Sequence, residues 1–210
     1  MFKEVQVLKK KCAFCDSKEL YKYGICETCY DNLNLNISFY KKFKYVDEIY
    51  IGCEYDSFLR DKMVKFKFKD ETYLYSFFGE LLIGKLLKNN LHKNYETITS
   101  VPMHKTSLKK RGYNQSELIA KYISENTLID YRPLLKKNSE TREQVELSSF
   151  DRGENLRGVF SCRKAVDGKS VIIVDDVITT GSTIEELAKV LKEAGAKKVA
   201  ALVVATRQSF

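Results

Sequence analysis

The sequence has no apolar stretch that approaches the ~20 residues required to span a bilayer. Its first residues, "MFKEVQVLKKKCAFC", lack the apolar core and small-residue cleavage site of a secretory signal. Internal repeats and low-complexity tracts are also absent, while 44% of the residues are hydrophobic, enough for a core. We therefore expect a globular cytoplasmic protein without membrane insertion.

Histidine is scarce, because His92 and His104 are the only two in 210 residues. Neither can be assigned as a general base from the sequence. Positive charge is plentiful, with 36 Lys and Arg against 28 Asp and Glu, a net charge of +8. Such an excess favours polyanionic partners but does not identify one, because lysine-rich genomes yield basic proteins without that role.

Four of the six cysteines form two Cys-x-x-Cys pairs with ten residues between them, namely Cys12, Cys15, Cys26 and Cys29. Two such pairs can bring four thiolates onto one tetrahedral Zn²⁺, and four thiolates leave no open position, so we expect a structural zinc finger. Disulfides are disfavoured in a reducing cytoplasm, and thioredoxin-like motifs use one pair that opens a helix. Cys53 and Cys162 stand in apolar surroundings, and we expect both to be buried.

The stretch "VIIVDDVITTGST" (171–183) predicts a strand, a turn and the start of a helix. Its β-branched run Val171–Val174 is typical of a buried parallel strand. Apolar residues then recur at helical spacing from Ile184 to Leu191, which predicts a helix that begins near residues 182–183 and stops at Gly195. The turn therefore lies at the carboxyl end of the strand and forms the helix N-terminus.

This turn is predicted to hold a phosphate, because helix N-termini present unpaired N–H groups and small residues let an anion approach. Its residues are Thr179, Thr180, Gly181, Ser182 and Thr183. It is not a P-loop, since no lysine adjoins Ser182 or Thr183. Asp175 and Asp176 call for sugar hydroxyls or Mg²⁺, and a ribose bearing a 5′-phosphate satisfies both halves. A solvated acid pair before an ordinary helix cap is the alternative.

Other segments predict an α/β fold. Strands are expected around Ile49 to Ile51, at "TITSV" (97–101) and at "KKVAALVVA" (197–205), and "FLRDKMVKFKFKDETYLYSFFGELLIGKLLKN" predicts two helices joined by a lysine-aromatic break. A capping sequence at Asn114 starts a further helix. This alternation predicts a doubly wound, mostly parallel sheet with ligands at the carboxyl ends of its strands. We expect a finger over residues 1–36 and a main domain over 37–210, with separate cores.

Two polar segments gain meaning from that arrangement. The loop that starts with Pro102, Met103, His104 and Lys105 follows a strand and leads into Lys109, Lys110 and Arg111, so a second anionic group could bind there. The stretch "TREQVELSSFDRGENLRGVF" suits a flap over a site, with polar residues Arg142, Gln144, Arg152, Asn155 and Arg157. Solvated charge and an ordinary surface loop are the respective alternatives.

These motifs together resemble the ComF family, the competence-associated branch of the type I phosphoribosyltransferase fold. The resemblance covers nearly the whole chain and rests on the four-cysteine knuckle, "VPMHKTSLKKRGYNQSELIA", "RGENLRGVF" and "VIIVDDVITTGST". It implies a type I phosphoribosyltransferase fold with a small N-terminal zinc finger. The chain departs from the family in the flap, where a Gln-Thr/Ser-x-Leu run is replaced by Gln144-Val145-Glu146-Leu147.

The resemblance also implies a ligand, phosphoribosyl pyrophosphate with Mg²⁺. It places the 5′-phosphate on Thr179, Thr180, Gly181, Ser182 and Thr183, the ribose hydroxyls on Asp175 and Asp176, and the pyrophosphate with Mg²⁺ on the loop that contains Met103, His104 and Lys105. In an active enzyme Asp175 and Asp176 would be the catalytic pair, steadying charge as pyrophosphate leaves C1.

Two functions follow from the resemblance. In the first, the protein acts in natural transformation, binding phosphoribosyl pyrophosphate and incoming single-stranded DNA, with a DNA-translocation helicase or a DNA-uptake channel as further partners. In the second, it is an active phosphoribosyltransferase of nucleotide or sugar-phosphate metabolism with an unknown acceptor.

The "KFKFK" stretch is the predicted DNA contact, with Lys65, Lys67 and Lys69 on phosphates and Phe66 or Phe68 stacked on bases. In an extended conformation the lysines would share one face and the rings the other. The alternative is that the phenylalanines enter the core. Lys9 to Lys11 offer a second basic cluster.

Overall fold

The computed structural model describes residues 11–37, 41–139 and 158–207. Its helices are α1 (Glu27–Asp31), α2 (Ser57–Phe68), the 3-10 helix η1 (Thr72–Leu74), α3 (Tyr75–Lys88), α4 (Leu91–Asn94), α5 (Lys105–Arg111), α6 (Gln115–Glu125) and α8 (Ser182–Glu193). Its strands are β1 (Glu48–Glu54), β2 (Thr97–Ser100), β3 (Asp130–Tyr131), β4 (Leu135–Lys137), β5 (Phe160–Cys162), β6 (Ser170–Ile178) and β7 (Lys198–Thr206). Within these ranges no helix combines the length and apolarity that crossing a membrane demands.

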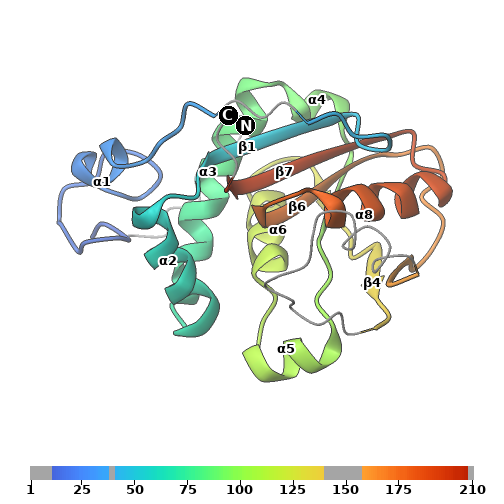
Figure 1. Cartoon of the computed structure of the whole chain (residues 1–210). Helices are drawn as coiled ribbons and strands as arrows, with labels where there is room; N and C mark the ends of the chain where they lie inside the picture. Colours follow the sequence, from blue (N-terminus) through green and yellow to red (C-terminus); the bar gives the residue numbers. More distant parts are fainter. Residues whose placement is uncertain (1–10, 38–40, 140–157, 208–210) are drawn as a thin grey trace.

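Five strands form a parallel sheet in the order β1-β7-β6-β2-β3, with β6 near its centre (Figure 1). Strands β4 and β5 pair antiparallel as a separate two-stranded sheet. Parallel neighbours require crossover connections, and the helices between the strands provide them. The expectation of a doubly wound parallel sheet is thus confirmed.

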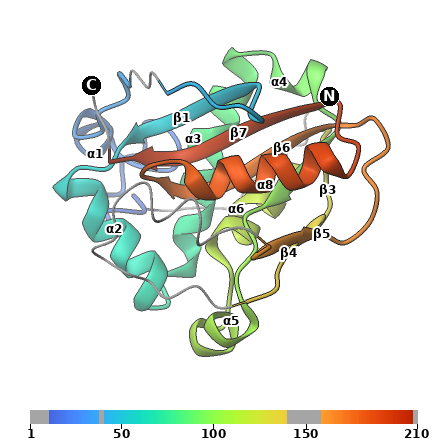
Figure 2. The same cartoon turned by 45° about the vertical axis from the view of Figure 1, so that its right-hand side comes forward.

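Helices cover both faces of the sheet, with α3 and α6 on one side and α8 on the other (Figure 2). Alternate residues of β6 serve the two sides: Ile172 and Val174 belong to the core under α3 and α6, while Val171 and Ile173 belong to the core under α8. A strand buried on both faces needs a continuous apolar run, which explains the composition of β6.

The finger does not have a core of its own, so the expectation of separate cores is wrong. The Phe14 ring lies 4.5 Å from that of Phe77 and 5.7 Å from that of Phe58, centroid to centroid. Lys62 Nζ donates to the Phe14 carbonyl at 2.7 Å. Buried residues of the finger therefore continue into the core beneath α2 and α3.

Three local expectations need correction. Strand β6 runs on through Asp175 and Asp176 to Ile178, so the acid pair lies on the strand and not after it. The basic segment after His104 is helix α5, which His104 caps and which Gly112 ends in the left-handed region with φ +85°. The two helices after β1 are separated at residues 69–71, so the lysine-aromatic stretch is the end of α2 and not a break.

The two remaining cysteines differ from each other. Cys53 on β1 is fully buried, as expected, and its thiol lies 3.4 Å from the Val204 carbonyl. Burial raises the pKa of Cys53 to about 12. Cys162 is only partly buried, which contradicts the expectation, because β5 belongs to the peripheral sheet and not to the central one.

Candidate functional site

The acid pair lies at the carboxyl edge of the central sheet. Asp175 pairs in register with Val203 of β7, and the Val101 N–H that follows β2 donates to the Val174 carbonyl at 3.0 Å. Strand β2 therefore ends beside the pair, whereas β6 and β7 stay paired as far as Ile178 and Thr206. Ligands of open parallel sheets bind at this edge.

Asp175 is held by the start of α6. Its Oδ1 accepts from the Ser116 hydroxyl at 3.0 Å and from the Asp176 N–H at 2.9 Å. Asn114 positions Ser116, because its side-chain oxygen accepts from the Ser116 N–H while its amide nitrogen donates to the Val101 carbonyl. Burial and the adjacent Asp176 raise the pKa of Asp175 to about 7. A carboxyl in this state is poised near neutrality.

Asp176 is paired with Lys67 of α2. Nζ of the lysine lies 2.7 Å from Oδ2 of the aspartate, and 24% and 13% of the two side chains are exposed. Burial lowers the pKa of Lys67, but Asp176 and Asp175 outweigh it and leave that pKa raised. The sequence assigned Lys67 to DNA, so this partner of the acid pair was missed.

The predicted phosphate turn follows β6 and opens α8 as expected. Gly181 has φ +76°, a conformation that favours glycine, and a Cβ there would lie 2.6 Å from the Phe43 ring, which would have to move. The Thr180 and Ser182 hydroxyls lie 3.0 Å apart. Gly181 is the N-cap of α8 and has no side chain to accept from the helix, and the Ser182 N–H donates to the Thr180 hydroxyl at 3.5 Å. Such a terminus favours an anion.

Residues 41–45 lie against this turn, an arrangement that the sequence analysis missed. The Lys41 ammonium group donates to the Thr180 carbonyl, and Glu185 of α8 accepts from the Lys44 N–H at 2.8 Å. Phe43 contributes the ring beside Gly181. Nothing in the local pattern of this segment reports a contact with residues so distant in the chain.

The second predicted loop leaves the same edge of the sheet, because it follows β2, the neighbour of β6. Met103 and His104 are partly buried, while Lys105 is exposed and is the first residue of α5. The His104 ring nitrogen Nδ1 accepts from the Thr106 N–H at 3.4 Å. A pyrophosphate contact for these residues stays a prediction. The flap residues Arg142, Gln144, Arg152, Asn155 and Arg157 lie outside the described residues.

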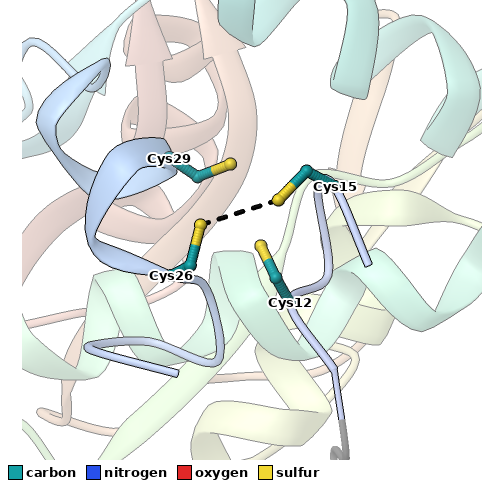
Figure 3. A group of neighbouring side chains, drawn as sticks. All are labelled: Cys12, Cys15, Cys26 and Cys29. Atoms are coloured by element: carbon teal, nitrogen blue, oxygen red, sulfur yellow. Dashed lines mark hydrogen bonds between the residues drawn. The ribbon is translucent and has the colours of Figure 1, made fainter. Parts of the chain in front are cut away.

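The four predicted zinc ligands come together, as Figure 3 shows. Their sulfur atoms all lie within 4.8 Å of one another, and the sulfurs of Cys15 and Cys26 are 3.6 Å apart. A tetrahedral site with Zn–S bonds of about 2.3 Å places its sulfurs about 3.8 Å apart. Burial and the three other thiols raise the pKa of the Cys29 thiol. The cluster has the geometry and the donor chemistry of a zinc finger.

The predicted DNA contact is not extended, since residues 65–68 are the last turn of α2. The two phenylalanine rings differ in burial: Phe66 is fully buried, whereas Phe68 is 66% exposed. The Arg111 guanidinium lies 4.9 Å from the centroid of the Phe68 ring. Lys65 and Lys69 line a hollow of about 300 Å³ together with Asp61, Lys62 and Val64. The extended arrangement with all lysines on one face is therefore wrong. Lys9 and Lys10 lie outside the described residues.

The chain resembles known proteins over about half of its length. Residues 100–209 match the family described as phosphoribosyl transferase domain. "Competence protein F" of Haemophilus influenzae is 35% identical over 50% of this chain and 47% of its own length. "Competence protein ComFC" of Streptococcus pneumoniae is 33% identical over 60% of this chain and 57% of its own length. The chain thus spans about half the length of the curated relatives it matches.

One solved structure illustrates the wider likeness. The glutamine phosphoribosylpyrophosphate amidotransferase from B. subtilis, solved with ADP and GMP, is 29% identical over 58% of this chain and 25% of that chain, with a TM-score of 0.40. A score this low adds no weight to the assignment. The matched half of the sequence, the parallel sheet and the four-cysteine cluster together show that the chain belongs to the phosphoribosyl transferase domain family and is a ComF-family protein.

Proposed function

We propose that this protein binds phosphoribosyl pyrophosphate with Mg²⁺ at the carboxyl edge of its sheet and binds single-stranded DNA, as a cytoplasmic competence-associated protein in natural transformation. The observation that carries the first half is the position of Asp175 and Asp176 on β6, directly before the glycine turn that opens α8. Hydroxyl acceptors and an anion site stand next to each other there.

The acid pair suits ribose hydroxyls better than a metal ion. Carboxylate oxygens are ligands that Mg²⁺ accepts. Asp176, however, already carries the Lys67 ammonium on Oδ2, and a second cation at that oxygen would be repelled. Mg²⁺ would instead reach the site with the pyrophosphate, next to the loop of Met103, His104 and Lys105. Bound there, it would neutralise charge on the leaving group.

Calorimetric titration of the wild-type protein tests this proposal. Phosphoribosyl pyrophosphate with Mg²⁺ should bind, and ribose 5-phosphate should bind more weakly, because it keeps the phosphate and hydroxyl contacts but lacks the pyrophosphate. Free pyrophosphate should bind weakest of the three, since it reaches neither the acid pair nor the turn. If none of the three ligands gave a binding heat, and none competed with another for the protein, the proposed site would be refuted.

The DNA proposal draws support from the surface where α2 and α5 meet. Phe68 offers an exposed ring, and the Arg111 guanidinium lies over it. Three exposed lysines are close in sequence to these two residues: Lys69 follows Phe68, and Lys109 and Lys110 precede Arg111. Exposed rings among cations are the usual platform for single strands. Names of the relatives refer to competence and to DNA utilization, which fits a nucleic-acid partner.

An active phosphoribosyltransferase is the second candidate, favoured by Asp175. A carboxyl with a pKa of about 7 takes up or releases a proton readily near neutrality. In that case, pyrophosphate would be released when phosphoribosyl pyrophosphate is mixed with an amine or base acceptor. A protein that binds the ligand but releases no pyrophosphate with any acceptor is a binding module.

We also propose that Cys12, Cys15, Cys26 and Cys29 hold one structural Zn²⁺. The four sulfurs already converge, and three of the four cysteines are buried. Elemental analysis of reduced, carefully purified protein should give close to one equivalent. Less than about half an equivalent would contradict the proposal, given how tightly four-cysteine sites hold zinc.

A further inference from the structure

The ion pair of Lys67 with Asp176 is unusual within the described part of the chain. No other lysine or arginine described there forms an ion pair with either member of the acid pair. Both of its side chains are mostly buried, whereas the Lys121–Glu117 pair has the same 2.7 Å separation with 50% and 35% of its side chains exposed. Exposed pairs contribute little, while breaking a buried one is costly.

Lys67 is held in place from both ends of α2. Asp56 caps the start of the helix by accepting from the Leu59 N–H at 2.8 Å. At the other end the Tyr113 hydroxyl donates to the Phe66 carbonyl, and the buried Phe66 ring lies 5.2 Å from that of Phe78. The residue before Lys67 is therefore fixed by backbone and side chain. The lysine is presented to the acid pair by a rigid element.

Tyr113 also connects this end of α2 to the start of α6. It immediately precedes Asn114, which caps α6 and positions the Ser116 hydroxyl on Asp175. One short segment thus fixes the partners of both carboxylates. Lys67 on one side and Ser116 on the other define where the two side chains lie.

The positive charge of Lys67 can favour ligand binding as well as the stability of the fold. Phosphoribosyl pyrophosphate is a polyanion, and two adjacent carboxylates would repel it. Lys67 cancels one of those charges next to the site, and it occupies Oδ2 of Asp176 only. The other oxygen of that carboxylate can accept a hydroxyl.

We propose that Lys67 is a positioning residue of the phosphoribosyl pyrophosphate site, which orients and neutralises Asp176 so that the aspartate can accept a ribose hydroxyl from an anionic ligand. This inference rests on the proposed function. It assigns to α2, outside the segment matched by the family, a direct part in building the site.

The test is calorimetric titration of Lys67→Met, Lys67→Arg and Lys121→Met with phosphoribosyl pyrophosphate and Mg²⁺, each well below its melting temperature. Lys67→Met should weaken binding by about 10- to 100-fold, by analogy with the loss when a residue that orients a metal ligand is removed. Lys67→Arg keeps the cation and should recover most of the affinity. Lys121→Met removes the exposed pair of equal length and should bind like wild type.

A double variant separates positioning from direct contact. If Lys67 acts through Asp176, then Lys67→Met should cost little further affinity in an Asp176→Asn background. That background also removes the unpaired carboxylate, so the comparison holds even if Lys67→Met alone does not fold. A large additional loss in the double variant would mean that Lys67 contacts the ligand itself and would overturn the positioning role.

Two further outcomes distinguish failure of this inference from failure of the proposed function. Folded Lys67→Met protein with wild-type affinity would show that the pair serves stability alone and would overturn the inference. Failure of the wild-type protein to bind the ligand would refute the proposed function itself. The two failures are told apart by the wild-type titration.

Discussion

Two clusters of like groups stand at different places in this protein, and each lowers its internal repulsion in a different way. At the sheet edge, Asp175 and Asp176 receive a cation and hydrogen bonds from the chain itself, through Lys67 and Ser116. In the finger, four thiols converge within 4.8 Å of one another. Their geometry instead matches an external ion.

The difference bears on what each cluster is for. Four thiolates around one Zn²⁺ would leave no position for another ligand, so the role we propose for the finger is structural. The acid pair is only half neutralised, which leaves carboxylate oxygens for a ligand with hydroxyl groups. The shared core of the finger with α2 ties the two together, because Lys67 is carried by the helix against which Phe14 packs.

The largest effect is expected in the finger from Cys26→Ser. It should remove most of the zinc and, because the finger shares its core with α2 and α3, lower the melting temperature of the whole protein by about 10 °C or more. Metal analysis and calorimetric melting measure both. Cys162→Ser, outside the cluster and partly exposed, is the control and should change neither. A Cys26→Ser protein with a full equivalent of zinc and an unchanged melting temperature would contradict a structural role for zinc in the finger.

Phe14→Ala separates the docking of the finger from its metal. The buried ring contacts Phe58 and Phe77, so its loss should cost about 3–5 kcal/mol in denaturant unfolding, while the thiols should still hold zinc. Tyr73→Ala, at an exposed ring, is the matched control and should stay within about 1 kcal/mol of wild type. An equally small cost for Phe14→Ala would restore the expectation of separate cores.

Asp175→Asn tests whether the ionised carboxylate of Asp175 destabilises the fold. Asp175 has a pKa of about 7 in the fold, above the ~3.9 of an unfolded chain. The folded state therefore binds more protons between those values, and stability falls as the pH rises from about 4 to 7. Asparagine removes this penalty, so the variant should gain roughly 2–4 kcal/mol at pH 8 and nothing near pH 4.

Urea unfolding at both pH values measures this gain. Asp130→Asn, at an exposed carboxylate on β3, serves as the control. A loss of stability in Asp175→Asn at pH 8 would show that the charge of Asp175 is stabilised by its surroundings. Burial and the adjacent Asp176 would then not raise the pKa of Asp175 as described.

The smallest effect concerns DNA, where Phe68 and Phe66 make a matched pair two residues apart. Phe68→Ala should melt normally and lose about 1–3 kcal/mol of binding to a single strand. Phe66→Ala should destabilise the fold by about 3–5 kcal/mol without a specific loss of binding. Fluorescence titrations with an oligonucleotide check both. Unchanged affinity and salt dependence in a Phe68→Ala, Lys69→Glu variant would exclude this surface.

The sequence predicted those parts of the fold that short-range patterns determine. Strand β6, the start of α8 and the capped start of α6 follow from apolar periodicity and capping residues within a few positions. Helix α5 was missed because it buries no side chain and so has no apolar periodicity. The end of α2 was misassigned because alternating Lys and Phe suggested an extended chain, although Leu59, Met63 and Phe66 share helical spacing and are all buried.

The sequence predicted the parts of the candidate site that lie within single short segments, but not the contacts between segments. The four cysteines and the acid pair with its glycine turn are local motifs; the cysteines converge as expected, and the turn opens α8 as expected, but the acid pair lies within β6. Lys67 on Asp176 and Phe43 on Gly181 are contacts between segments far apart in the chain. A single sequence carries no pattern for such contacts, and the same holds for the docking of Phe14 on α3.

Calorimetric titration of the Asp175→Ala, Asp176→Ala variant against wild type, with phosphoribosyl pyrophosphate and Mg²⁺, tests the central claim most directly. The account predicts that the variant, shown by melting to be folded, loses at least about 10-fold in affinity, because two charge-assisted hydrogen bonds to the ribose disappear. Equal affinity of the two proteins would contradict it and would place the ligand, if bound at all, away from the carboxyl edge of the sheet.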